Sequence, residues 1–375
     1  MKSGLFQGSW QLGTVMGIPI RVHFSWLLVF GLITWSLSTQ YFPAAAPELL
    51  WFSYWINGLL AALLLFGSVA FHELAHSWVA RRYGMNISGI TLFIFGGVSE
   101  LEGEVPNPRA EFRIAVVGPL SSLFLAGLFF LLARQTAGGG IQALFFYLAR
   151  INLILGIFNL IPGFPMDGGR VLRAAIWSRK KDFFQATRKA SGIGQKFGLF
   201  LIIFGIFSLF GRMPGGLWLM LIGWFLYTAA QASYQQATLQ QSLAGVKVKD
   251  IITRDLVTLP ATMSLEEAVS EYFLKHGFGG FPVMTNGRFL GFITLKEIKN
   301  IRREEWGSVT VSELAVLPGE KGEVTLEDEA MKSLELMIKE DKGRIAVLDR
   351  GAFVGMITRN GIARFLQIKK EMAGM

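Results

Sequence analysis

Two histidines separated by three residues lie within a long apolar stretch of the chain. The run His72-Glu73-Leu74-Ala75-His76 has the form HExxH. On a helix, its two imidazoles stand one turn apart on the same face, spaced to share a zinc ion. Glu73 then lies where it can deprotonate a water molecule at the metal. Ionisable residues inside an apolar span are costly and mark function, so the motif predicts a metal site built within a membrane.

The composition favours a membrane protein with a soluble tail. The 375 residues are 52% hydrophobic and 17% charged, which is too apolar for one ordinary soluble domain. The chain has no Cys, so any zinc must be bound by His and carboxylate ligands. A net charge of +9 invites a nucleic-acid partner. However, the basic residues fall between apolar spans, which fits membrane orientation better, and no nucleic-acid partner is predicted.

The apolar stretches predict a multi-pass α-helical protein with about six spans. The expected spans cover approximately residues 25–41, 55–80, 114–133, 141–161, 197–210 and 217–232. Lys and Arg concentrate in the loops after the second and fourth of these spans. The positive-inside rule therefore places these loops and both termini in the cytoplasm of a cell-membrane protein.

Residues 89–99 are too short to span a membrane as a helix. They are rich in β-branched and aromatic side chains and bounded by glycines, which predicts a short membrane-associated β-hairpin. Two interpretations remain. The hairpin is either a plain juxtamembrane element or a strand edge that captures an unwound substrate by backbone pairing.

A catalytic zinc usually has three protein ligands, and HExxH supplies only two. At the end of the fourth span, residues 159–170 read NLIPGFPMDGGR, and two prolines and three glycines break the helix there. Broken backbone at membrane depth is tolerated where it faces protein or a water-filled cavity. Asp167 is therefore either the third ligand or an N-cap of the helix that begins at Gly168. The residues alone leave both interpretations open.

Three motifs together resemble one family. HELAH in one span, Gly118-Pro119 between the spans, and NLIPGFPMDGGR at the end of a later span look like the site-2 protease family of intramembrane zinc metalloproteases. The resemblance covers residues 1–235. It implies a zinc endopeptidase that hydrolyses peptide bonds of transmembrane protein substrates within the lipid bilayer, in regulated intramembrane proteolysis.

The resemblance also implies roles for individual residues. His72, His76 and Asp167 would bind one Zn²⁺ per chain, and Glu73 would be the catalytic base. Asn159 would help to position or stabilise the reacting peptide carbonyl.

Beyond a Gln-rich linker at residues 236–245, the α/β tail at 246–375 repeats itself. Two similar halves, approximately 246–302 and 308–368, resemble a tandem of cystathionine-β-synthase (CBS) domains, which often bind adenine nucleotides between the halves. The resemblance implies nucleotide contacts at Thr294, Glu297 and Thr358. The second copy has Gly361 where the first has Glu297, so a structural or homodimer-forming pair remains an equal alternative.

Two rival functions fit part of the sequence. A transporter or channel gated by a CBS pair should show an internal repeat of broken helices, but the spans contain one strongly broken segment. A protease relative that binds substrates without cutting them would have no need for the general base Glu73. The sequence therefore favours the protease, with its CBS pair in a regulatory role.

Overall fold

The computed structural model describes residues 8–94, 96–102, 105–211, 215–316 and 323–373. The described chain divides into a membrane unit, which ends at Leu239, and a tail unit, which begins at Gln240. Each unit has its own packing, and each is described separately.

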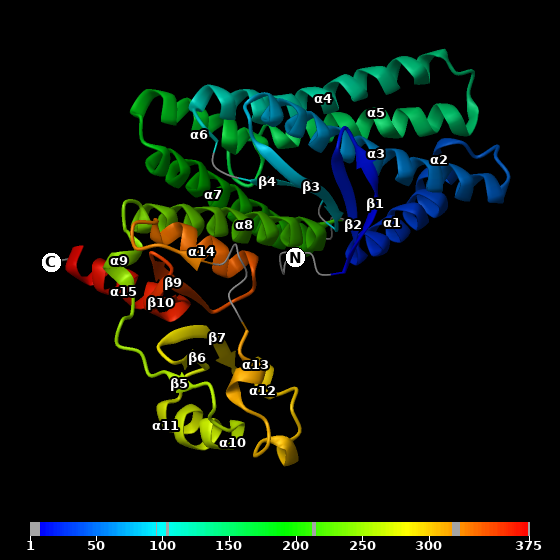
Figure 1. Cartoon of the computed structure of the whole chain (residues 1–375). Helices are drawn as coiled ribbons and strands as arrows, with labels where there is room; N and C mark the ends of the chain where they lie inside the picture. The colour runs from blue at the N-terminus through cyan, green and yellow to red at the C-terminus, as the bar shows by residue number, and fades with distance from the viewer. Residues whose placement is uncertain (1–7, 95, 103–104, 212–214, 317–322, 374–375) are drawn as a thin grey trace. The chain divides into compact units, whose positions relative to one another are not determined.

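Long apolar helices make up most of the membrane unit (Figure 1). Within the described residues, four helices are long and apolar enough to cross a membrane: α3 Trp51–Arg82, α4 Pro108–Gln135, α5 Gly139–Asn159 and α7 Phe183–Phe210. The shorter or less apolar helical segments are α1 Phe24–Ser36, a π-helical stretch Leu37–Tyr41, α2 Phe42–Ala45, α6 Asp167–Lys180 and α8 Gly216–Leu243. The expected first and sixth spans fall in α1 with the helical turns that follow it and in α8, so the count of six stays a prediction.

The outer sides of these helices are apolar, while their inner sides contain small residues. Leu131, Phe124 and Phe207 are more than half exposed, as expected of side chains that face lipid. Ala61, Ala62 and other small residues are buried and let the helices approach closely. The buried residues of α3 also include four polar ones, Ser68, His72, His76 and Ser77.

A four-stranded sheet lies against the membrane helices. Its order is β1-β2-β3-β4, with antiparallel pairing at both ends and a parallel β2–β3 pair in the middle. The region of the expected hairpin forms β3 and β4, and its association with the membrane stays a prediction. The strands are β1 Ser9–Val15, β2 Ile18–His23, β3 Asn86–Phe93 and β4 Gly96–Glu102. Strand β4 contacts α3, which brings an edge of the sheet beside the HExxH motif.

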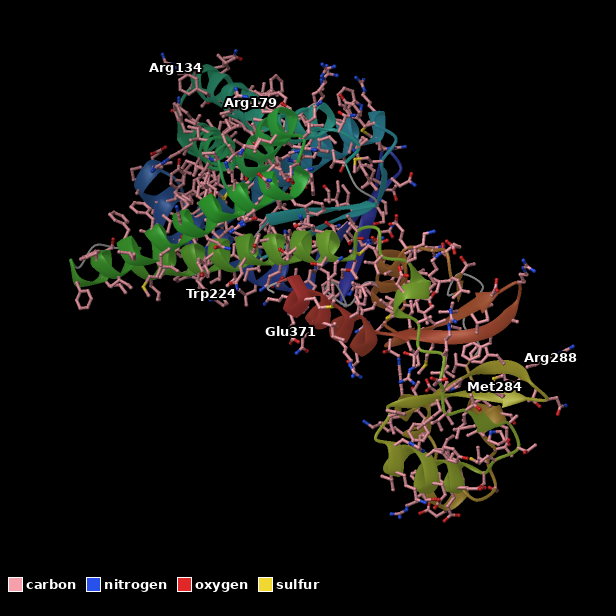
Figure 2. All side chains as sticks on the ribbon, turned by 90° about the vertical axis from the view of Figure 1, so that its left-hand side faces the viewer. Arg134, Arg179, Trp224, Met284, Arg288 and Glu371 are labelled. Carbon is pink, nitrogen blue, oxygen red and sulfur yellow. The ribbon has the colours of Figure 1, made fainter. Side chains whose placement is uncertain are left out.

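The tail unit contains two copies of one motif. In each copy a short strand pairs in parallel with the first strand of an antiparallel hairpin. The hairpin turns Asn286-Gly287 and Arg350-Gly351 both have positive φ, as tight two-residue turns require. Figure 2 labels Met284 and Arg288 on the first of these hairpins. The strands are β5 Leu259–Pro260, β6 Gly280–Thr285 and β7 Arg288–Thr294 in the first copy, and β8 Glu323–Val324, β9 Arg344–Asp349 and β10 Ala352–Thr358 in the second.

Helical segments complete each copy. The first copy has α10 Leu265–Glu267, α11 Leu274–His276 and α12 Leu295–Ile298, with a π-helical stretch Ala268–Phe273. A 3₁₀ turn Arg303–Glu305 and α13 Val311–Leu314 follow. The second copy has α14 Ala330–Lys339 and α15 Arg359–Ala373, and α9 Val248–Ile251 opens the unit. The copies pack together where the rings of Phe289 and Phe353 stack with their centroids 4.2 Å apart.

Candidate active site

The two histidines of HExxH lie side by side on the buried face of α3. His72 and His76 are 5% and 4% exposed, and their Nε2 atoms are 3.1 Å apart. The spacing of four residues puts both rings on one face of the helix. The geometry expected from the motif is therefore present in the fold.

Asp167 lies beside these two rings, although it comes much later in the sequence. It is the first residue of α6, and Met166 rather than Asp167 occupies the N-cap position. Asp167 Oδ2 lies 3.1 Å from His72 Nε2 and 3.0 Å from His76 Nε2. The three side chains form a buried group that could hold a metal ion. The carboxylate thus contacts the imidazoles instead of capping its own helix.

The Nδ1 atoms of His72 and His76 both have hydrogen-bond partners, which leaves the Nε2 atoms to bind a metal. His76 Nδ1 lies 2.6 Å from the carbonyl oxygen of Ile114. A carbonyl can only accept, so Nδ1 carries the proton and Nε2 of the neutral ring keeps its lone pair. His72 Nδ1 is paired with the hydroxyl of Ser122 at 2.9 Å. Such partners fix ring orientation in metal-binding histidines.

Three electron-rich atoms therefore converge in a buried space. Neutral imidazole nitrogens and a carboxylate oxygen repel one another unless a cation lies among them. Their separations of 3.0–3.1 Å are close to the spacing of about 3.4 Å that tetrahedral bonds of about 2.0–2.2 Å to zinc would give. The residues present therefore fit a zinc ion.

Gly118 on α4 leaves the room that this site needs. A Cβ atom at Gly118 would lie 2.1 Å from His76 Nε2 and 2.7 Å from His72 Nε2. No side chain fits there without displacing a ring. The glycine of the Gly118-Pro119 pair therefore has a steric role at the site.

Glu73 is held by strand β4. The hydroxyl of Ser99 donates to Glu73 Oε2 at 2.7 Å, and Ser77 donates to Ser99 at 3.3 Å. A Cβ atom at Gly97 would lie 2.6 Å from Glu73 Cγ, so the backbone of β4 packs directly on this side chain. The general-base candidate and the sheet edge are thus in contact.

A buried ion pair supports the segment that carries Asp167. Arg173 on α6 donates from Nε to Glu111 Oε1 at 2.6 Å, and Glu111 on α4 is fully buried. The guanidinium also lies 4.8 Å from the ring of Phe164 and 4.5 Å from that of Phe183. These contacts join α4, α6, α7 and the loop before Asp167. They give the third-ligand candidate a rigid support.

The role expected for Asn159 stays a prediction, and two further polar residues of the membrane unit have structural contacts. Asn159 is the last residue of α5 and half-buried, next to the loop that leads to Asp167. Two turns earlier on the same helix, Asn152 is fully buried and donates to Ser68 on α3 at 3.2 Å. His23 caps α1 through its Nδ1, which accepts from the backbone N–H of Ser25.

In the tail unit, a cavity of about 400 Å³ lies between the two copies. Thr294, Glu297 and Arg344 line it, whereas Thr358 is not among its lining residues and accepts from Gly361 N–H instead. Thr294 donates to the Glu297 carboxylate from its amide at 2.9 Å and also from its hydroxyl. Burial lowers the pKa of Arg344, and the Glu297 carboxylate opposes that shift. The fold brings two of the three predicted nucleotide contacts to one cavity.

Comparison with known proteins identifies both parts of the chain. The model of peptidase family M50 matches residues 60–138 and 132–205, and that of the CBS domain matches residues 248–304. The putative zinc metalloprotease Rip3 of Mycobacterium tuberculosis is 35% identical over 95% of this chain and 92% of its own length. The chain belongs to peptidase family M50, the site-2 protease family.

A second relative and one solved structure are similar to this chain to a comparable extent. The zinc metalloprotease MJ0392 of Methanocaldococcus jannaschii is 34% identical over 96% of this chain and 98% of its own length. Among solved structures, the site-2 protease from the same organism is 33% identical, covers 60% of this chain and 95% of that chain, and has a TM-score of 0.43. The family matches make this M50 chain a membrane metalloprotease with a C-terminal CBS domain. These matches favour the protease interpretation over that of a CBS-gated transporter.

Proposed function

We propose that the chain is an intramembrane zinc endopeptidase that hydrolyses peptide bonds of membrane-embedded protein substrates. The observation that carries the proposal is the convergence of His72 Nε2, His76 Nε2 and Asp167 Oδ2 in a buried space inside apolar helices. The names of the two relatives, a putative zinc metalloprotease and a zinc metalloprotease, support zinc as the metal.

The chain's own residues then have distinct tasks. A zinc ion held by His72, His76 and Asp167 would supply a Lewis acid that lowers the pKa of water and polarises a carbonyl. Glu73 accepts the proton of the attacking water and returns it to the leaving amine. Asn159 offers a neutral amide donor for the oxyanion, a role that rests on the family resemblance.

Strand β4 provides a place for the substrate backbone. One edge of β4 pairs with β3, and the other edge has no strand partner among the described residues. A helical substrate hides its carbonyls in i to i−4 hydrogen bonds, so the scissile region must unwind before cleavage. Pairing of the extended segment along β4 would place it beside Glu73, which β4 already contacts.

We expect the purified protein to carry one zinc per chain and to lose it when one ligand is removed. His72→Ala and Asp167→Ala should reduce bound zinc, measured by elemental mass spectrometry, to near background because two ligands bind zinc far more weakly than three. A chelator should abolish cleavage, and added zinc should restore it. His276→Ala, which removes an exposed histidine of the tail unit, is the control and should keep full zinc. Full zinc and activity in Asp167→Ala would disprove the third-ligand assignment.

We also propose that the protein lies in the cell membrane with both termini and the tail unit in the cytoplasm. The support is the Lys and Arg bias of residues 81–113 and 170–196. Reporter fusions ending at Arg109, Lys181 and Gln241 should all report the cytoplasmic side. A signal from the opposite side at any of them would contradict the six-span topology.

Finally, we propose that the cavity between the two tail copies binds an adenine nucleotide and that binding regulates substrate cleavage. Arg344 offers a charge for phosphate, and Glu297 offers an acceptor for a ribose hydroxyl. A nucleotide regulates only if it binds one arrangement of the protein more tightly than another.

Calorimetric titration of ATP, ADP and AMP into the full chain should show binding, and Arg344→Gln should weaken it by about tenfold or more because a charged hydrogen bond is lost. Arg288→Gln, on the β6–β7 hairpin outside the cavity (Figure 2), should bind normally. Absence of binding at millimolar nucleotide would leave the tail as a dimerisation or docking module.

A further inference from the structure

A second, separate groove lies on the membrane unit between α6 and α7, which pack against each other (Figure 1). The groove is open to one side and has a volume of about 580 Å³. Ile176 of α6 and Ile193 of α7 line it with apolar surface, and Arg188, Lys189 and Lys196 of α7 add three positive charges. None of these residues belongs to the candidate active site.

The positive charges of this groove lack acidic partners among the described residues. Residues 170–196 contain eight Lys and Arg residues and a single acidic residue, Asp182. Asp182 is already used to cap α7, where it accepts from the backbone N–H of Gln185 at 2.9 Å. Within the described parts of the chain, no carboxylate forms an ion pair with Arg188, Lys189 or Lys196. The groove is therefore complementary to an anion.

The setting of the groove selects the kind of anion. It lies in the basic N-terminal part of α7, a helix that is long and apolar enough to cross a membrane. A ligand that matches it needs a phosphate for the basic side chains and an apolar body for the isoleucines. We propose that the groove binds the headgroup and the adjoining acyl region of an anionic glycerophospholipid, as basic pockets between membrane helices do.

The same turns of α7 support the Asp167 loop on another face. Phe164 donates its backbone N–H to the carbonyl oxygen of Ala190 at 3.3 Å. A Cβ atom at Gly194 would lie 1.9 Å from the carbonyl oxygen of Phe164, so helix and loop are in close contact. A bound lipid braces α7 against this loop. That consequence for the metal site rests on the proposed function, whereas lipid binding does not.

The test measures lipid binding directly on the full chain. Wild type is reconstituted in nanodiscs of phosphatidylcholine containing a fraction of phosphatidylglycerol, and the phosphatidylglycerol retained per chain after detergent extraction is counted by native mass spectrometry. The triple variant R188Q/K189Q/K196Q should lose roughly tenfold or more of its preference for phosphatidylglycerol, since each basic residue contributes to anionic lipid binding. The matched control R109Q/R179Q/K181Q removes the same number of charges from residues that do not line the groove, one of them the Arg179 that Figure 2 labels, and should retain the preference.

A second variant tests the groove without changing charge. A Cβ atom at Gly192 would meet nothing within 4 Å, so the side chain of Gly192→Leu starts in open space at the groove and should also reduce retention by occupying part of it. Equal loss in the control triple variant would show diffuse charge attraction and overturn the proposal. Full retention in Gly192→Leu would overturn it as well. Competition by inorganic phosphate alone, at concentrations equal to the lipid, would identify a free anion as the ligand instead. These outcomes are independent of zinc content and cleavage.

Discussion

Replacing Glu73 with glutamine is expected to slow peptide cleavage by about 100- to 10,000-fold, the usual contribution of a general base. The amide keeps the size of the side chain and can still interact with Ser99, but it cannot accept the proton of water. Because Glu73 is not one of the three converging ligand candidates, bound zinc and folding should be preserved. The measurement is the rate of cleavage of a membrane-embedded substrate in detergent or nanodiscs, together with zinc per chain.

The control is Glu48→Gln, which makes the same chemical change at an exposed carboxylate between α2 and α3. It should cleave at the rate of wild type. Substantial turnover by Glu73→Gln would exclude Glu73 as the base. Loss of zinc in Glu73→Gln would mean instead that Glu73 is one of the metal ligands.

Gly118→Ala is expected to have a comparably large effect, although it adds a single methyl group. The new Cβ would lie 2.1 Å from His76 Nε2, so the ring must turn away from the metal-binding position. We expect zinc affinity to fall by about 10- to 100-fold or more, the range seen when the support of a metal ligand is lost. Competition with a chromogenic chelator measures this loss.

Gly127→Ala is the matched control on the same helix. A Cβ atom there meets nothing within 4 Å, so alanine should leave zinc affinity unchanged. It should also be neutral or stabilise α4 by about 0.5–1 kcal/mol, since alanine is the better helix former. Equal zinc affinity in the two variants would contradict the steric role of Gly118.

The central part of the candidate site could be predicted because its determinants are local. The helical spacing of His72 and His76 follows from four residues of sequence, and the broken segment around Asp167 is visible as prolines and glycines. The partners of these residues could not be predicted in this way. Ser122 and Ser99 are ordinary hydroxyls in the sequence, and only the packing of α4 and β4 on α3 brings them to His72 and Glu73.

The same division applies to the fold. The repeat in the tail was predictable because both copies show the same order of apolar runs and turns, and the two sheets have equivalent pairing. The sequence pattern does not predict strands β1 and β2. The parallel pairing of β2 with β3 joins Ile20 to Ile90, and a contact across so many residues leaves no periodic signal in a single sequence.

The ion pair of Glu111 and Arg173 has a consequence for biogenesis. Sixty-two residues separate the two partners, so α4 is made long before α6. An isolated charge sealed away from water is costly, and the pair relieves that cost only when both helices are present. A nascent or truncated chain that stops after α4 therefore exposes an unmatched carboxylate. Synthesis of α6 supplies Arg173 as the partner of this carboxylate. The same helix carries Asp167 to the two histidines, so the ion pair and the metal site form together.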